Sequence, residues 1–339
     1  MKICTVSMSP KLGNKKKNID KMEKFIKKED ADLYIFGEMS LTGYACREEI
    51  FSLAEGKDGE SIKKIREICD DKGLIFGMPF EERKGIIYNS AVFVKPDGVE
   101  IYNKNFLANF GPFEEKFYFS PGKDLPVFNF KGWKIGIAIC YDIFFPELIK
   151  GIALKGADLI VCISASPSLT RKQFESVLPS RAIENTVFVA YSNLVGEENG
   201  LSFWGGSRVY KPNGEIINKT EYFKEESVVC EIDMNELREA RIARPTLKDT
   251  TPDIFLELYN ISRHKEVFNE YVKIGIEMGE RAKKEMKIEE VDLYGNEDVA
   301  FGIKVATGCR VNLYRSNEIK AIFKGDKEME IKPENNKTF

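Results

Sequence analysis

The fold is decided by one stretch near the middle of the chain, which reads Ile135-Gly136-Ile137-Ala138-Ile139-Cys140-Tyr141-Asp142-Ile143-Phe144-Phe145-Pro146-Glu147. Its first five residues form an uninterrupted apolar run, typical of a buried β-strand. Pro146 followed by Glu147 predicts the first turn of a helix, where proline is well tolerated. A sharp strand-to-helix turn lifts its side chain out of the sheet and directs a backbone N–H toward it. The stretch therefore predicts an α/β fold in which the Cys140 thiol stands clear of the strand.

Strand and helix patterns alternate outward from this stretch in both directions. Strands are predicted over residues 3–8, 32–37, 74–79, 88–94, 133–139, 159–163 and 187–193. Amphipathic helices are predicted over residues 18–28, 60–72 and 171–185, with another opening at Pro146. A hairpin is expected around Lys211-Pro212-Asn213-Gly214. Apolar strands alternating with helices indicate sheets covered by outer helices, which is a layered α/β fold.

The chain has 339 residues, about two average domains, and its pattern changes between Ala243 and Pro252, where two Xaa-Pro steps interrupt it. We place a domain boundary there. The main domain covers residues 1–245, and a small α+β domain without an assigned role covers residues 255–333. Within the small domain we expect a helix over residues 266–286 and short strands over residues 299–305 and 319–323.

Composition excludes several classes of protein. Lys plus Arg (51) nearly balances Asp plus Glu (54), for a formal charge of −3, so the protein as a whole does not coat nucleic acid or an anionic membrane. No apolar run approaches the roughly 20 residues of a membrane span, and the first residues read as a strand rather than a leader. We therefore expect a cytoplasmic protein with no nucleic-acid or membrane partner. The abundance of Lys, Glu and Ile beside a single glutamine favours a thermophilic source.

The cysteine and histidine counts limit the chemistry. Seven cysteines without a CxxC pair argue against both a disulfide framework and a cysteine-rich zinc site. His264 is the one histidine, so Ser-His-Asp triads and multi-histidine metal centres are excluded. A papain-like Cys140–His264 pair is a rival, but Cys140 lacks the CGSCW context of that family, and full activity of a His264→Ala variant would eliminate it. Acid–base chemistry then belongs to carboxylates, lysine, cysteine or tyrosine, and we predict no metal or cofactor.

Two more segments place a polar side chain just after an apolar strand. They are Ile35-Phe36-Gly37-Glu38-Met39-Ser40-Leu41-Thr42-Gly43-Tyr44 and Ile101-Tyr102-Asn103-Lys104-Asn105-Phe106-Leu107. Ligand sites gather at strand ends in α/β folds, because the backbone there is rigid while side chains reach solvent. Taken singly, Glu38 is a solvated turn carboxylate, Lys104 a surface lysine and Cys140 a small buried side chain. Their shared placement at strand ends favours one common pocket.

In this order the three segments resemble the carbon–nitrogen hydrolase (nitrilase and amidase) superfamily, whose pattern is a glutamate before TGY, a lysine in YxK and a cysteine in C-x-D-xx-FPE. The resemblance spans roughly residues 1–245, and Gly37 replaces the family's proline before the glutamate. Supporting matches are Phe113-Glu114-Glu115, Phe119-Ser120-Pro121-Gly122, Ser180-Arg181-Ala182-Ile183-Glu184-Asn185, Ser192-Asn193-Leu194-Val195-Gly196 and Trp204-Gly205-Gly206-Ser207. The resemblance implies a four-layer α-β-β-α sandwich that forms a homodimer or higher homo-oligomer through its helices.

The resemblance also implies roles for four side chains. Cys140 would be the nucleophile and Glu38 the general base. Lys104 would stabilise the oxyanion together with the Tyr141 N–H, and Glu115 matches a second family glutamate that positions the site. A thiol with a pKa near 8.5 is only a few per cent thiolate at neutral pH, so it needs such a base or cation. The implied reaction is hydrolysis of a non-peptide C–N bond in a small amide through a cysteine acyl-enzyme, which releases ammonia or an amine.

The acyl group is less constrained by the sequence. Phe144 stands where many relatives that act on dicarboxylate monoamides or carbamoyl acids carry an arginine, and its ring offers no charge for a carboxylate. The residues expected to contact substrate are Tyr141, Phe144, Tyr44, Asn193 and Ser164. The run of residues 109–119 resembles the glutaminase domain of glutamine-dependent NAD synthetases. An ammonia-supplying glutaminase subunit, a true nitrilase and a degenerate binding or assembly module stay open as alternatives.

Residues 255–333 resemble the E-like domain of formylmethanofuran dehydrogenase, through Gly275-Ile276-Glu277-Met278-Gly279 and Ala306-Thr307-Gly308-Cys309. The metal-ligand positions of that family fall near Lys265 to Val267 and Asp298 here. Because Cys309 alone cannot hold zinc, the resemblance implies that the metal site has been lost. The simpler alternative is a packing or dimer-forming extension.

Overall fold

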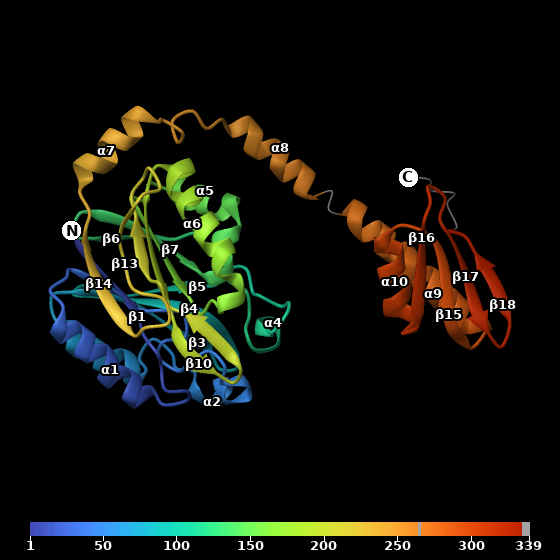
Figure 1. The fold of residues 1–339 in the computed structure, drawn as a ribbon, viewed down its shortest axis with the longest axis horizontal. Helices are drawn as coiled ribbons and strands as arrows, with labels where there is room; N and C mark the ends of the chain where they lie inside the picture. The colour runs from blue at the N-terminus through green and yellow to red at the C-terminus, as the bar shows by residue number, and fades with distance from the viewer. Residues whose placement is uncertain (264–265, 334–339) are drawn as a thin grey trace. The chain divides into compact units, whose positions relative to one another are not determined.

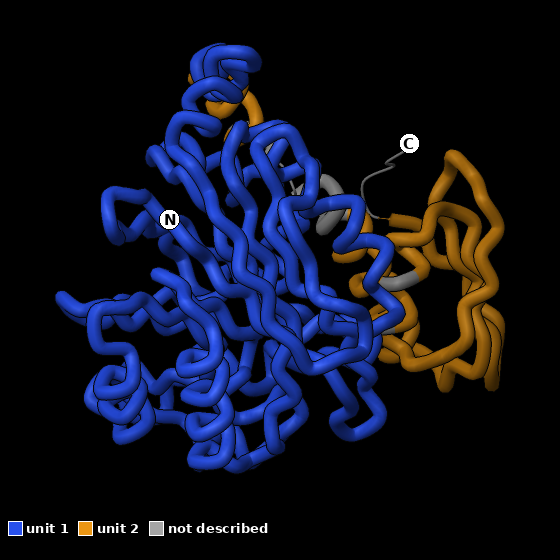
Figure 2. The backbone as a smooth tube through the Cα atoms, turned by 60° about the vertical axis from the view of Figure 1, so that its left-hand side comes forward, with its two compact units in different colours: residues 1–250 blue, residues 251–339 orange. Residues whose placement is uncertain are grey.

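The computed structural model describes residues 1–263 and 266–333. The chain divides into two compact units, residues 1–250 and residues 251–339 (Figure 2). His264 and Lys265, both discussed above, lie outside the described part of the chain. Among the described helices, none combines the length and the apolar character that a membrane crossing requires.

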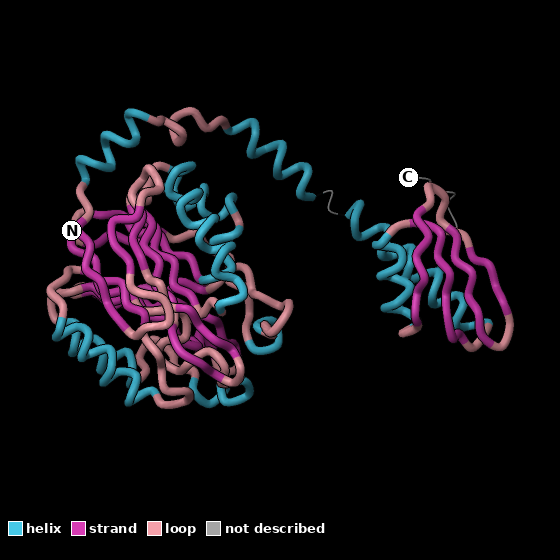
Figure 3. The backbone as a smooth tube through the Cα atoms, in the orientation of Figure 1, coloured by secondary structure: helices cyan, strands magenta, loops and turns pink. Residues whose placement is uncertain are grey.

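The first unit contains two six-stranded sheets packed face to face (Figure 3). One sheet has the strand order β14 (Glu226–Glu231), β1 (Lys2–Ser7), β2 (Leu33–Ile35), β3 (Gly73–Arg83), β4 (Ile86–Lys95) and β5 (Gly98–Asn103). The other has the order β13 (Ile216–Lys219), β12 (Arg208–Tyr210), β9 (Phe188–Asn193), β8 (Leu159–Ser164), β7 (Trp133–Ile139) and β6 (Val127–Phe130). Strands β1 to β3 are parallel, as are β7 to β9, so each trio ends at one edge of its sheet.

Helices cover the outer face of each sheet and complete four layers (Figure 1). The first sheet carries α1 (Lys15–Lys28) and α3 (Glu60–Cys69), and the second carries α5 (Pro146–Leu154) and α6 (Arg171–Asn185). Asn14 caps α1 with its side chain, and Ile19 and Met22 face the sheet at a three-residue step. Shorter elements are α2 (Ile50–Leu53), α4 (Glu115–Tyr118), α7 (Met234–Ala243) and the hairpin of β10 (Val195–Glu198) and β11 (Leu201–Trp204). The expected α-β-β-α sandwich is confirmed.

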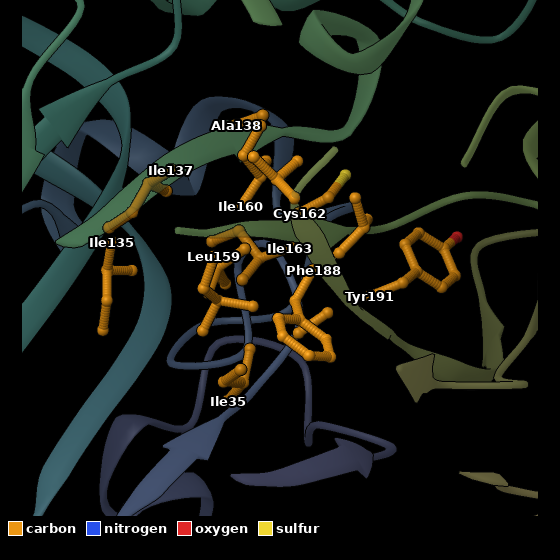
Figure 4. Close-up of a cluster of buried hydrophobic side chains, with 14 of the residues drawn as sticks. Ile35, Ile135, Ile137, Ala138, Leu159, Ile160, Cys162, Ile163, Phe188 and Tyr191 are labelled. Atoms are coloured by element: carbon orange, nitrogen blue, oxygen red, sulfur yellow. The ribbon is translucent and has the colours of Figure 1, made fainter. Parts of the chain in front are cut away.

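The space between the two sheets is filled by branched and aromatic side chains. Figure 4 shows Ile135, Leu159 and Phe188 of β7, β8 and β9 in one cluster with Ile35 of β2. All four side chains are fully buried. Strands apolar on both faces suit this arrangement, because helices cover the outside and the facing sheet covers the inside. The ends of β2 and β7, from which Glu38 and Cys140 follow, are therefore held by rigid packing.

The second unit packs helices on a four-stranded sheet. Its elements are α8 (Pro252–Arg263), α9 (Glu266–Glu285), β15 (Ile288–Gly295), α10 (Glu297–Thr307), β16 (Arg310–Arg315), β17 (Lys320–Gly325) and β18 (Glu328–Ile331), with the strand order β16-β15-β17-β18. The strand predicted over residues 299–305 is wrong, because these residues lie inside α10. The β-branched residues there favour strands as isolated residues. Asn296 instead caps a helix and Gly308 ends it in the left-handed conformation.

Candidate active site

Cys140 lies at a strand-to-helix turn. The residue directly follows β7 and adopts φ +49°, a conformation that non-glycine residues rarely take. A 3₁₀ turn over Cys140–Phe144 leads into α5, which has proline in its first turn, as the sequence predicts. Arg181 of α6 supports the turn by donating hydrogen bonds to the carbonyls of Ile143 (2.8 Å) and Phe144 (3.2 Å). Backbone strain at a position fixed so firmly by its surroundings is typical of a functional residue.

A buried cation lies between two buried carboxylates. Lys104 Nζ donates to Glu38 Oε1 and to Glu115 Oε1, each at 2.8 Å. Lys104 and Glu38 are fully buried, and Glu115 is 3% exposed. The three residues come from the ends of β5 and β2 and from the start of α4, so segments far apart in the sequence meet here. Charges are buried in proteins only when they are paired in this way.

Other hydrogen bonds complete the two carboxylates. Asn89 Nδ2 donates to Glu38 Oε1 (2.7 Å), and the Ala165 N–H donates to Glu38 Oε2 (2.8 Å). The Tyr44 hydroxyl donates to Glu115 Oε1 (2.8 Å), and the Ala108 N–H donates to Glu115 Oε2 (3.0 Å). Each carboxylate is thus fixed by donors on both oxygens. Fully bonded networks of this kind hold their side chains rigidly.

The network acts electrostatically on the thiol. Burial raises the pKa of Cys140 well above its usual range, and the charge of Glu38 adds to the increase while Lys104 opposes it. Burial would lower the pKa of Lys104, but the charges of Glu115 and Glu38 outweigh it and hold the ammonium charged. Burial raises the pKa of Glu115, against the attraction of Lys104. The resting site therefore holds a neutral thiol beside a charged lysine, so the thiol needs a base to attack.

The thiol opens into an aromatic pocket of about 330 Å³. Its lining residues are Ala108, Phe110, Phe113, Cys140, Tyr141, Phe144, Ser166, Pro167, Thr170, Gln173 and Phe174. Phe144 packs edge-to-face on Phe174, with ring centroids 5.0 Å apart, and Phe110 packs on Tyr141 at 4.9 Å. None of these lining side chains is charged. The pocket is therefore suited to a small uncharged group with an apolar face.

The five residues expected to contact substrate separate into two groups. Tyr141 and Phe144 line the pocket beside Cys140. Ser164 and Asn193 are fully buried and are not among its lining residues; Asn193 Oδ1 instead accepts the Ser166 N–H at 2.8 Å and supports the pocket wall. Tyr44 holds Glu115 and borders a neighbouring pocket of about 280 Å³.

Three polar residues at the site received no role from the sequence. Asn89 holds Glu38, Arg181 holds the cysteine turn, and Asp142 accepts hydrogen bonds from three donors. Arg181 and Asp142 lie within quoted motifs, so each was visible as a polar residue without a partner. Asn89 interrupts the apolar run of a predicted strand, and a buried polar residue in such a run was the available signal.

An α/β sandwich with a cysteine at a strand-to-helix turn and a buried Glu–Lys–Glu network defines a hydrolase of the nitrilase type. The family model described as carbon-nitrogen hydrolase matches residues 2–242. The chain belongs to the carbon–nitrogen hydrolase family, whose members act on C–N bonds.

Individual relatives agree with the family. A "Nitrilase" of Pyrococcus abyssi is 37% identical over 71% of this chain and 93% of its own length. A "Glutamine-dependent NAD(+) synthetase" of Acinetobacter baylyi is 32% identical over 77% of this chain, but only 50% of its own length is covered. Among solved structures, a mutant of an amidase of the nitrilase superfamily from Nesterenkonia AN1 aligns with a TM-score of 0.65 at 25% identity, over 76% of this chain and 97% of its own.

Proposed function

We propose that this enzyme hydrolyses the C–N bond of a small uncharged amide through an acyl-enzyme on Cys140. The observation that carries the proposal is the buried Glu38–Lys104–Glu115 network, whose charges act on a neutral thiol at the mouth of an uncharged aromatic pocket. A base, a cation and a nucleophile in one desolvated site are the groups that acyl transfer requires.

The proposed reaction begins when Glu38 accepts the thiol proton and the Cys140 sulfur attacks the amide carbon. Lys104 and the Tyr141 N–H stabilise the negative oxygen of the tetrahedral intermediate. Removal of one such donor typically raises the barrier by about 2.7 to 4 kcal/mol. Glu38 then returns its proton to the nitrogen, and ammonia or an amine leaves a thioester. Glu38 next takes a proton from water, the hydroxide attacks the thioester, and the proton returns to the departing sulfur.

The pocket supports a neutral acyl group. Phe144 and Phe174 form an aromatic wall, and a carboxylate placed against them would lose its hydration without gaining a partner. Amides of aliphatic or aromatic monocarboxylic acids should therefore be preferred over monoamides of dicarboxylic acids. We further propose that the enzyme is cytoplasmic and works as a homo-oligomer, as the family resemblance implies; light scattering of the purified protein tests the second point.

A glutaminase is the second candidate, because the synthetase from Acinetobacter baylyi matches 77% of this chain. Glutamine carries an α-ammonium and an α-carboxylate, and the lining of the Cys140 pocket offers neither of them a charged partner. The aromatic lining therefore favours the monocarboxylic amide over glutamine.

Ammonia release tests both candidates in one screen. The panel contains aliphatic and aromatic monoamides, glutamine, asparagine, carbamoyl compounds and nitriles. Cys140→Ala should abolish turnover, whereas Cys69→Ala, which removes a buried thiol of α3, should retain it. Turnover that survives Cys140→Ala would overturn the mechanism, and a preference for glutamine would replace the first candidate by the second.

A further inference from the structure

Asp142 lies two residues after the cysteine and accepts hydrogen bonds from two different segments. Its Oδ1 accepts the Phe106 N–H at 2.9 Å. Its Oδ2 accepts the Ile139 N–H at 3.0 Å and the Tyr102 hydroxyl at 2.8 Å. The side chain is fully buried. A buried carboxylate with three donors is among the most firmly held groups in a protein.

The three donors lie next to the two reactive side chains. Tyr102 precedes Lys104 by two residues and Phe106 follows it by two, so the carboxylate holds the lysine segment on both sides. Ile139 is the last residue of β7 and directly precedes Cys140. The Phe106 ring also stacks on Phe145, at the other end of the cysteine turn, with ring centroids 3.5 Å apart. The lysine and cysteine segments are therefore joined at two places, of which Asp142 is the polar one.

We propose that Asp142 is a positioning residue that ties the lysine segment to the cysteine turn and so sets the alignment of Lys104 Nζ with Cys140 Sγ. The value of that alignment rests on the proposed function, because only acyl transfer places an oxyanion between the two atoms. A displacement of about 1 Å between reacting groups reduces rates by about a hundredfold. A carboxylate that accepts from both segments prevents such a displacement.

The electrostatic surroundings give this role a pH dependence. Burial raises the pKa of Asp142 to about 6, while the charge of Lys104 and the three hydrogen bonds oppose the increase. The titratable groups that face it are Tyr102 on β5, Lys104 beyond β5 and Cys162 on β8. A protonated carboxyl has fewer acceptor sites and one O–H, so it cannot keep all three bonds. Activity should fall as the pH decreases through about 6.

The first test is Asp142→Asn, which keeps the shape but places an NH₂ group opposite backbone N–H donors. Iodoacetamide, itself a small amide, reports on Cys140, and mass spectrometry measures the rate of alkylation. We expect alkylation at neutral pH to slow by about ten- to a hundredfold, and kcat for the best amide of the screen to fall similarly with little change in KM. Alkylation and turnover at the wild-type rate in a folded variant would overturn the proposal.

The second test is Tyr102→Phe, which removes one hydroxyl and remains informative if Asp142→Asn does not fold. The Tyr102 bond lowers the pKa of Asp142, so its loss raises that pKa and should move the acid limb of the pH–activity profile to higher pH. Tyr34→Phe is the matched control, because it removes a buried hydroxyl bonded to the Ile26 and Glu29 carbonyls, and it should leave the limb unmoved. An unmoved limb in Tyr102→Phe would contradict the proposal.

The two readouts separate this inference from the proposed function. Slower alkylation in Asp142→Asn with no amide turned over by the wild type would contradict the proposed function and keep the positioning role. Turnover by the wild type with unchanged alkylation and turnover in Asp142→Asn would do the reverse. Tyr102→Phe decides between them by alkylation as well, since weaker positioning should slow it by less than Asp142→Asn does.

Discussion

Replacing Lys104 by methionine should destabilise the protein in a way that depends on pH. Lys104 Nζ lies 2.8 Å from one oxygen of Glu38 and 2.8 Å from one oxygen of Glu115. Without the cation, two buried carboxylates face each other with nothing between them. Two such charges about 6 Å apart repel by about 3 kcal/mol at an effective dielectric constant of about 20. That repulsion corresponds to about two pKa units on one carboxyl group.

The sign of the pH dependence follows from this shift. The folded-state pKa of one carboxyl group rises from its unfolded value near 4.3 toward about 6. A carboxyl group with a raised folded-state pKa is tolerated below its unfolded value, and its cost appears as the pH rises through the folded value. Lys104→Met should therefore be less stable than wild type by about 3 to 5 kcal/mol at pH 8, the range for breaking a buried ion pair. At pH 5 the deficit should be smaller.

Urea denaturation at pH 5 and pH 8 measures both deficits. The double variant Lys104→Met/Glu115→Gln removes one of the two charges and serves as the control; its deficit should differ little between the two pH values. Equal deficits for Lys104→Met at both pH values would refute the reasoning, because they would mean that the carboxylates do not repel in the folded state. Hydrolysis by Lys104→Met should fall by about 10²- to 10³-fold through loss of the oxyanion donor.

Three further variants test other parts of the molecule. Phe144→Arg should shift amide preference toward substrates with a second carboxylate, by about tenfold or more in relative kcat/KM, because a guanidinium would pair with that group. Asn89→Ala removes the 2.7 Å bond to Glu38 and should lower the free energy of unfolding by about 1.5 to 3 kcal/mol in a urea titration. Gly302→Ala should destabilise the second unit by about 1 to 3 kcal/mol, since a Cβ there would lie 2.2 Å from the Val272 carbonyl oxygen of α9, and differential scanning calorimetry would detect it.

Local patterns predicted the fold of the first unit, because its strands and helices carry their signals within a few residues. The apolar run of residues 135–139 and the proline at 146 sufficed for the strand, turn and helix around Cys140. The contacts within the site carried no such signal. Ala165 lies 127 residues from Glu38 and donates through its backbone, which any residue type provides. Only the fold brings these groups together.

The error at residues 299–305 has the opposite cause. Val299 and Ile303 read as strand residues because β-branched side chains favour extended backbone. In α10 both are fully buried, and Gly302 lets the helix approach α9 closely. The caps at Asn296 and Gly308 were legible as helix boundaries, and tertiary packing against α9 supplies what the intrinsic propensity lacks.

The charge distribution at the site explains how the enzyme works without histidine. A thiolate–imidazolium pair stores the activated nucleophile before substrate arrives, whereas here burial and Glu38 keep the Cys140 thiol neutral. Lys104 cannot act as the base, because two carboxylates hold it charged. The proton must therefore pass to a carboxylate during attack, when the negative charge moves from sulfur toward the oxygen that Lys104 stabilises. The cation thus favours the transition state more than the resting thiol, which is the condition for catalysis rather than mere binding.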